Sequence, residues 1–204
     1  IYNHDEPLLN ELVDNLNNGY KIPIGMAANS DNMATVINNN LRFTIQRKQY
    51  DIELIENPLH GKHNLYNILA ASVAAKLAGV EDKAIQKGLQ SFKPLEHRLE
   101  YAGCFKNVHF YNDSIATIPE AAMAAVKALD NVSTIILGGY DRGINYASLA
   151  LFLKDSKIEN VILLAQAGKR IYSELEKVQF KGRFEVVADM EKAVLMAYKY
   201  TPAG

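Results

Sequence analysis

The sequence predicts an α/β fold in which a mainly parallel sheet carries helices on both faces, preceded by a part of different organisation. Two observations predict it. After Pro94, short apolar and β-branched runs alternate with helical patterns, which is typical of parallel strands joined by helical crossovers. Before that point, two strand patterns and three helical patterns follow without such alternation. The change near Phe92-Lys93-Pro94 divides the chain into two predicted domains, residues 1–93 and 94–204.

The first part contains a predicted hairpin and a long helix. Two alternating segments, 41–46 and 50–55, are separated by a short polar stretch, which predicts an antiparallel pair. Residues 63–78 form the strongest helical pattern, with apolar side chains four apart and Gly79 as a stop signal. Shorter helices are predicted at 8–16 and 81–89.

The second part contains four predicted strand–helix units. Strands are expected at 108–111, 133–137, 161–164 and 184–187, and helices at 119–129, 146–153, 169–178 and 190–200. In open parallel sheets, ligands bind beyond the carboxyl ends of the strands. The loops that follow the first two of these strands are therefore expected at the same edge of one sheet.

Composition and charge limit the possible partners. The 204 residues carry a net charge of −1, which provides no overall attraction to nucleic acid, so anion binding must be local. The single Cys104 excludes an internal disulfide and suits a reducing cytosol, so we expect a cytoplasmic protein. No apolar run approaches the roughly 20 residues that cross a bilayer, and no membrane association is expected. From its first and last residues, Ile1-Tyr2-Asn3 and Pro202-Ala203-Gly204, we expect the chain to be an internal part of a longer protein.

Four polar motifs follow one another along the chain. They combine asparagine, arginine, aspartate and hydroxyl side chains with a Gly-Gly turn, which are residue types that hold polyanionic substrates. In order, the motifs are Gly61-Lys62-His63-Asn64-Leu65-Tyr66-Asn67, His97-Arg98-Leu99-Glu100, Asn112-Asp113-Ser114-Ile115-Ala116-Thr117 and Gly138-Gly139-Tyr140-Asp141-Arg142-Gly143.

Each loop motif alone also has a purely structural interpretation. Asp113 and Ser114 can cap the turn into the next helix, and Gly138-Gly139 can form only a tight turn. Likewise, His97-Arg98 can be a linker pair and Arg142 a solvated surface charge. The joint occurrence of the motifs in this order is what these interpretations leave unexplained.

The helical motif is open to the same two interpretations. His63 can cap the long helix or pack within it. Asn64 and Asn67 lie three apart on one helical face, and asparagine is mildly unfavourable inside a helix, which favours a ligand role for both.

The order and wording of the four motifs resemble the Mur ligases of peptidoglycan synthesis, and within them the branch that adds glutamate to UDP-N-acetylmuramoyl-L-alanine. The resemblance implies that residues 1–93 are the last part of the central ATP-binding domain and 94–204 most of the C-terminal Rossmann-like domain. The family's phosphate loop, Gly-x-x-x-x-Gly-Lys-[Ser/Thr], and its Mg²⁺ ligands do not occur in this sequence. We therefore expect the 204-residue chain alone neither to hydrolyse ATP nor to ligate.

The resemblance also implies roles for individual residues. It implies that the nucleotide is contacted by His63, Asn64, Asn67, Arg98 and Asp113. Arg98 is expected to reach the phosphates, and Asp113 is expected to meet the nucleotide on domain closure. Arg98 and Asp113 are the expected catalytic residues. Contacts to the amino-acid substrate fall to Ser114, Thr117 and Arg142. The family commonly has lysine where this sequence has Ile115, so D- and L-glutamate both stay open as the substrate.

The implied chemistry is ATP-driven amide synthesis through an acyl phosphate, with ATP and Mg²⁺ required, in cell-wall synthesis and hence in cell shape and division. The expected partners are UDP-N-acetylmuramoyl-L-alanine and glutamate, and the expected state is a monomer. Two alternatives stay open: a sibling Mur or folylpolyglutamate-type ligase, and a non-catalytic Rossmann-like binding module.

Overall fold

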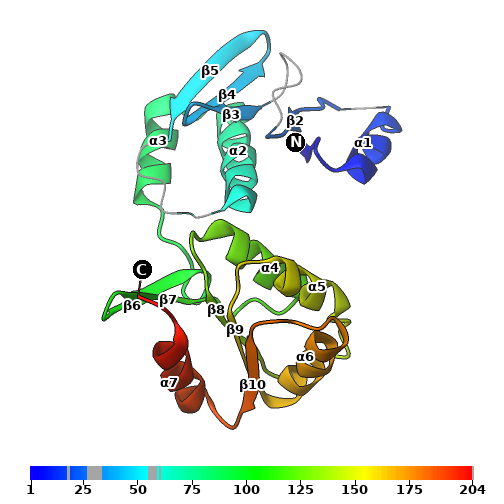
Figure 1. Ribbon diagram of the computed structural model, residues 1–204. Coiled ribbons are helices and arrows are strands. Elements are labelled where there is room, and N and C mark those ends of the chain that lie inside the picture. The colour runs from blue at the N-terminus through cyan, green and yellow to red at the C-terminus, as the bar shows by residue number, and fades with distance from the viewer. Residues whose placement is uncertain (18, 27–33, 55–58, 60, 204) are drawn as a thin grey trace. The chain divides into compact units, whose positions relative to one another are not determined.

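The computed structural model describes residues 1–17, 19–26, 34–54, 59 and 61–203. They form two compact units, Ile1–Pro94 and Leu95–Gly204, each with its own hydrophobic core (Figure 1). Among the described residues, no helix combines the length and apolar character that crossing a membrane requires.

Unit 1 packs helices against a small antiparallel sheet. Its helices are α1 (Pro7–Asp14), α2 (Lys62–Leu77) and α3 (Asp82–Ser91). Its strands are β1 (Tyr2–Asn3), which pairs in parallel with β2 (Pro23–Ile24), and β3 (Thr35–Ile37), β4 (Asn40–Ile45) and β5 (Lys48–Glu53), which pair antiparallel in that order. The predicted helices and the predicted hairpin are confirmed, although Ile55 of the predicted second strand lies outside the described residues. Strands β1, β2 and β3 were not predicted, because two or three residues are too short to show a periodicity.

The β4–β5 hairpin illustrates how local sequence sets this sheet. Ile45 pairs with Lys48, and both residues between them, Gln46 and Arg47, have positive φ angles of 50° and 65°. This is the backbone of the two-residue turns that match strand twist. Leu41, Phe43 and Ile45 alternate on the buried face and pack in one core with residues of α2 and α3.

Unit 2 contains a hairpin followed by alternating helices and strands. Its elements are β6 (Glu100–Phe105), β7 (Val108–Asn112), α4 (Pro119–Ala128), β8 (Thr134–Gly138), α5 (Ala147–Asp155), β9 (Asn160–Leu164), α6 (Ala165–Lys177), β10 (Arg183–Val187) and α7 (Met190–Tyr200). Strands β8, β9 and β10 form a parallel sheet in the order β10-β9-β8.

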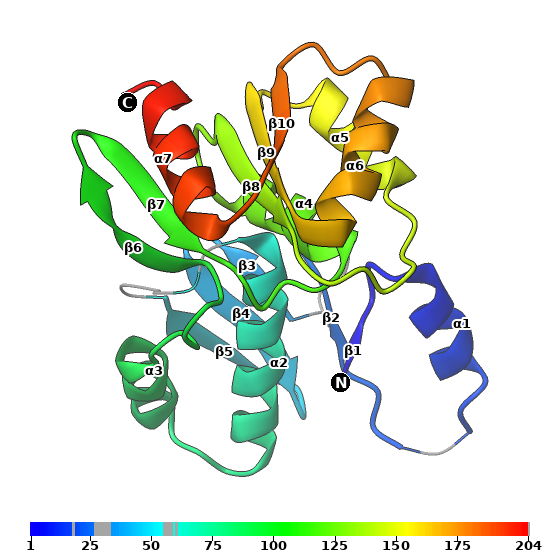
Figure 2. The ribbon, with the colours of Figure 1, turned by 90° about the horizontal axis from the view of Figure 1, so that it is seen from below.

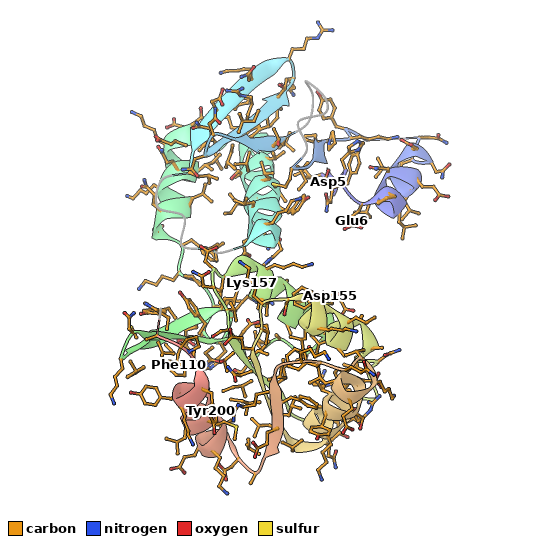
Figure 3. The ribbon with its side chains drawn as sticks, viewed as in Figure 1. Asp5, Glu6, Phe110, Asp155, Lys157 and Tyr200 are labelled. Carbon is orange, nitrogen blue, oxygen red and sulfur yellow. The ribbon has the colours of Figure 1, made fainter. Side chains whose placement is uncertain are left out.

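The parallel sheet of unit 2 has helices on both faces, as predicted. Val161 and Leu163 of β9 pack with α4, α5 and α6, whereas the alternate residue Ile162 packs with α7 on the opposite face (Figure 2). All three are at most 1% exposed. This explains the continuous apolar run of β9, since a central parallel strand is covered on both sides. Phe110 of β7 joins the cluster on the α7 face (Figure 3).

The prediction that the 108–111 strand belongs to the parallel sheet was wrong. In the described residues, β7 pairs antiparallel with β6 and not with a strand of the β8–β10 sheet. Strand β6 was not predicted. Its register shifts between Tyr101 and Gly103, and this shift interrupts the alternation of side chains between the two faces of the strand. Helix α6 also begins at Ala165, directly after β9, rather than at Lys169.

Candidate functional site

Two of the polar motifs, residues 97–100 and 112–117, are joined in unit 2. The β6–β7 register pairs Glu100 with Asn112, which brings the chain before β6 next to the loop after β7. The Leu99 backbone N–H donates to Asp113 Oδ1 at 3.0 Å in a partly buried bond, and the Ile115 N–H donates to the His97 carbonyl at 3.3 Å. Arg98 is thus flanked on both sides by residues bonded to the loop 112–117.

The turn that carries Arg98 has an unusual backbone. His97 and Leu99 have φ angles of 63° and 47°, in a left-handed region that costs residues with side chains about 1–2 kcal/mol. The His97 N–H donates to the Glu100 carboxylate at 2.9 Å, and His97 Nδ1 lies 2.8 Å from Asn112 Nδ2. These contacts hold the turn in its strained form, and such strain is concentrated at functional sites.

The loop after β7 is ordered by its own side chains. Asn112 Oδ1 accepts the Ser114 N–H at 3.1 Å, a typical Asx turn. Asp113 does not cap α4, because its carboxylate is bonded to Leu99 and the cap position is Ile118, which makes no side-chain cap bond. Ser114 and Thr117 are exposed, and neither hydroxyl is bonded to another of the described residues.

Arg98 is exposed, and within the part of the chain that the structure describes its guanidinium makes no hydrogen bond or ion pair. A guanidinium presents donors in a planar fork that matches phosphate and carboxylate oxygens. The turn, which the Asp113 carboxylate anchors through Leu99, therefore presents a cation to solvent.

The Gly-Gly motif follows β8 and is fixed to the start of α6. Gly138 has a φ of 149°, and a Cβ there would lie 2.1 Å from the Leu164 carbonyl oxygen, so only glycine fits. The Gly139 N–H donates to the same carbonyl at 3.2 Å, and the Gly139 carbonyl accepts the Ala167 N–H at 3.2 Å. The tight-turn interpretation of this motif therefore holds for its two glycines.

The rest of this loop is organised around Asp141. Its Oδ1 accepts the Gly143 N–H at 2.9 Å and pairs with Arg170 Nη1 of α6 at 2.6 Å. The Gly143 hydrogen bond, followed by that of Arg170, holds the pKa of Asp141 below its ordinary value. Arg142 is exposed, and its guanidinium has no partner among the described residues. Sequence reasoning missed Arg170, although its place in the helix after β9, a strand of the parallel sheet, was a usable signal.

His63, Asn64 and Asn67 lie at the start of α2 in unit 1. Asn64 is buried, whereas His63 and Asn67 are exposed. Asn67 Nδ2 donates to Asn64 Oδ1 at 3.3 Å, so the two side-chain amides form one polar group, as their spacing predicted. A surface hollow of about 410 Å³ adjoins this helix start and is lined by Asn3, Glu6, Lys62, His63 and Tyr66.

A hydrogen-bonded pair lies next to this hollow. The Tyr66 hydroxyl donates to the carboxylate of Asp5, which also accepts the Met26 N–H at 2.8 Å. The bond from Met26, followed by that from Tyr66, lowers the pKa of Asp5, and burial together with Asp5 raises the pKa of Tyr66 to about 12. Asp5 and Glu6 occupy the turn between β1 and α1 (Figure 3).

The structure therefore joins some predicted site residues and not others. Arg98, Asp113 and Ser114 come together in unit 2, with Thr117 in the same loop. Among the described residues, no hydrogen bond or ion pair links that loop to Arg142. His63, Asn64 and Asn67 belong to the other unit.

Comparison with curated proteins gives similarity over the whole chain, although no family profile matches it. The UDP-N-acetylmuramoylalanine–D-glutamate ligase of Caldicellulosiruptor bescii is 30% identical over 205 residues, covering 100% of this chain and 44% of that protein. The enzyme of the same name from Geobacillus sp. is 35% identical over the same shares. That from Solibacter usitatus is 42% identical over 118 residues, 58% of this chain and 27% of that protein.

Solved structures share the fold. MurF from Acinetobacter baumannii matches with a TM-score of 0.63 at 17% identity, over 88% of this chain and 41% of that one. The bifunctional folylpolyglutamate synthase/dihydrofolate synthase of Yersinia pestis matches with a TM-score of 0.57 at 16% identity, over 82% and 39%. At these identities the likeness is one of architecture.

Fold and sequence together define the class of protein: the chain belongs to the Mur ligase family. The curated relatives reported above are the D-glutamate ligases of that family. The chain spans a little under half their length, at 44% of the first of them.

Proposed function

We propose that this chain supplies nucleotide-contacting and glutamate-contacting residues to a cytoplasmic, monomeric ligase that joins glutamate to UDP-N-acetylmuramoyl-L-alanine in peptidoglycan synthesis. In this reaction the alanine carboxylate attacks the γ-phosphate of ATP and ADP leaves. The glutamate amine then attacks the acyl phosphate, an amide forms and phosphate leaves. One observation carries the proposal: the bonds between 97–99 and 113–115 fix the turn of Arg98, whose guanidinium has no partner among the described residues. The chain that holds this turn is similar to glutamate ligases over its full length.

Arg98 is the proposed phosphate ligand. Its two neighbours are bonded to the loop 112–117, so the guanidinium projects from a fixed turn. Fixing a charged donor before substrate binds reduces the ordering cost on binding and places the charge where phosphate charge develops. Asp113 uses Oδ1 for Leu99, which leaves Oδ2 to accept a hydrogen bond from the nucleotide.

In unit 1, the proposed nucleotide contacts are His63, Asn64 and Asn67. The hydrogen bond between the two asparagines orients their amides with respect to each other, and His63 lies beside them on the wall of the hollow. We propose that unit 1 is part of the central ATP-binding domain and unit 2 most of the C-terminal domain. Among the described residues, no group of three or more histidine, cysteine, aspartate or glutamate side chains could hold a metal ion, and we assign Mg²⁺ none of them.

For glutamate, we propose contacts from Arg142 and from the hydroxyls of Ser114 and Thr117. Arg142 offers a fork that fits a carboxylate, and its neighbour Asp141 is already paired with Arg170. Ile115 is 49% exposed and offers no charge where the family commonly has lysine. This observation favours a second candidate, a ligase that accepts L-glutamate.

The test is ligation by the full-length protein with ATP, Mg²⁺, UDP-N-acetylmuramoyl-L-alanine and either D- or L-glutamate, following phosphate release and product mass. We expect one phosphate per amide formed with D-glutamate. Product with L-glutamate only would establish the second candidate, and product with a diamino acid only would move the protein to a sibling ligase. Neither ATP hydrolysis nor ligation with any amino acid would indicate a binding module.

Arg98→Ala tests the nucleotide role within the same assay. Losing one charge-assisted contact to phosphate is expected to lower kcat/KM about ten- to hundredfold. The matched control is Arg183→Ala, which removes an arginine whose guanidinium lies 3.5 Å from the Tyr200 ring centroid, away from both loops. If both variants keep wild-type kinetics, Arg98 is not a phosphate ligand.

A further inference from the structure

Arg142 lies in a loop that hydrogen bonds hold at its start and at its centre. At its start, Gly139 is bonded on one side to the end of β9 and on the other to the first turn of α6, both at 3.2 Å. At its centre, Asp141 accepts the Gly143 N–H at 2.9 Å. Arg142 lies between Asp141 and Gly143, which are bonded to each other, and it is exposed.

Arg170 connects this loop to α6 and α5. Its Nη1 is 2.6 Å from Asp141 Oδ1, and its guanidinium lies 5.4 Å from the ring centroid of Tyr146. Tyr146 is 8% exposed and is the residue that precedes α5. One side chain therefore contacts both the middle and the far end of the loop that holds Arg142.

The pairing also decides which arginine is neutralised. Asp141 is adjacent in sequence to Arg142, so without another partner its carboxylate would attract the Arg142 guanidinium. Arg170 occupies that carboxylate, and in the described residues Arg142 stays unpaired. An unpaired guanidinium on an anchored loop keeps its full charge for a substrate carboxylate.

We propose that Arg170 is a positioning residue for the amino-acid substrate: by pairing with Asp141 it holds the loop 139–146 and leaves Arg142 free to bind the glutamate carboxylate. This inference rests on the proposed function. It assigns Arg170 no contact with substrate, so its effect passes through Arg142.

The kinetic experiment compares Arg170→Met, which removes the charge but keeps a long apolar stem, with Arg142→Met and the double variant in the full-length protein. Arg170→Met is expected to raise the KM for glutamate about fivefold, while the KM for ATP stays within twofold. In the Arg142→Met background it is expected to add less than twofold, because the residue on which it acts is gone. Arg170→Lys keeps the positive charge and is expected to restore most of the affinity.

The matched control is Lys177→Met, which removes a cation from the same helix and breaks an exposed ion pair with Glu174 at 2.7 Å. It is expected to leave both KM values unchanged. An unchanged glutamate KM in Arg170→Met, an equal rise in the ATP KM, or full additivity with Arg142→Met would overturn the inference. If Arg170→Met does not fold, Asp141→Asn removes the same ion pair and the same outcomes decide.

Hydrogen exchange of the peptide spanning 139–146 tests the loop independently of the reaction. Loss of the Arg170 contact is expected to raise exchange at Gly143 at least about fivefold, whereas Lys177→Met leaves it unchanged. Unchanged exchange would overturn the positioning role even in an active enzyme. A wild-type protein that does not use glutamate, with exchange altered as expected, would refute the proposed function but not the anchoring of the loop.

Discussion

Asp113 links two of the motifs of unit 2, residues 97–100 and 112–117, and replacing it by alanine removes the acceptor of the Leu99 N–H. That bond is 3.0 Å long and partly buried, and an unpaired donor at such a site costs about 1–3 kcal/mol. Leu99 also has a φ of 47°, a conformation that the bond helps to maintain. We expect Asp113→Ala to lower the free energy of unfolding by about 1–3 kcal/mol and to release the turn that presents Arg98.

Asp113→Asn separates the two proposed roles of this side chain. The amide oxygen can still accept the Leu99 N–H, whereas the negative charge offered to the nucleotide is lost. We expect Asp113→Asn to keep most of the stability and to lose kcat/KM with ATP about tenfold, while Asp113→Ala loses both.

The measurements are urea unfolding and ligation kinetics of the full-length protein. The control is Asp155→Ala, at the end of α5, where an exposed aspartate (Figure 3) makes no hydrogen bond or ion pair with other described residues. Its stability is expected to change by less than about 0.5 kcal/mol. If Asp113→Ala has the same free energy of unfolding in urea as the wild type, the structural role assigned to this carboxylate is wrong. It is also wrong if Asp113→Asn loses as much stability as Asp113→Ala.

Three further predictions concern other parts of the chain. Ile115→Lys adds a cation beside the proposed glutamate contacts and should change the KM for glutamate more than that for ATP; equal changes would contradict this. Gly138→Ala should cost at least about 2 kcal/mol in urea unfolding and more than Gly139→Ala, because a Cβ at 138 meets the Leu164 carbonyl oxygen at 2.1 Å whereas one at 139 meets nothing within 4 Å. The Tyr66–Asp5 bond should stabilise unit 1 at pH values below 10.0, the ordinary pKa of tyrosine, and this stabilisation should be lost as the pH rises toward about 12. Tyr66→Phe should remove this pH dependence of the free energy of unfolding.

The sequence by itself determined most of the secondary structure and the layering of unit 2. In unit 2, the alternation of strand and helix patterns predicted a sheet covered on both faces, and Val161, Ile162 and Leu163 of β9 are indeed divided between opposite helical layers. In α2, Leu69 and Val73 lie four apart and are both buried. These predictions hold because periodicity reports which face of an element is buried, and the removal of apolar side chains from water is the main driving force of folding.

The tertiary structure alone decided which motifs meet. Sequence patterns did not reveal β6, yet its pairing of Glu100 with Asn112 is what brings Leu99 to Asp113. They also did not connect Asp141 with Arg170, which follows one strand later along the chain. The first contact depends on the register of β6 and β7, and the second on how the loop after β8 packs against α6. A local pattern contains no information about its distant partner, so the presentation of Arg98 and Arg142 is a property of the folded unit.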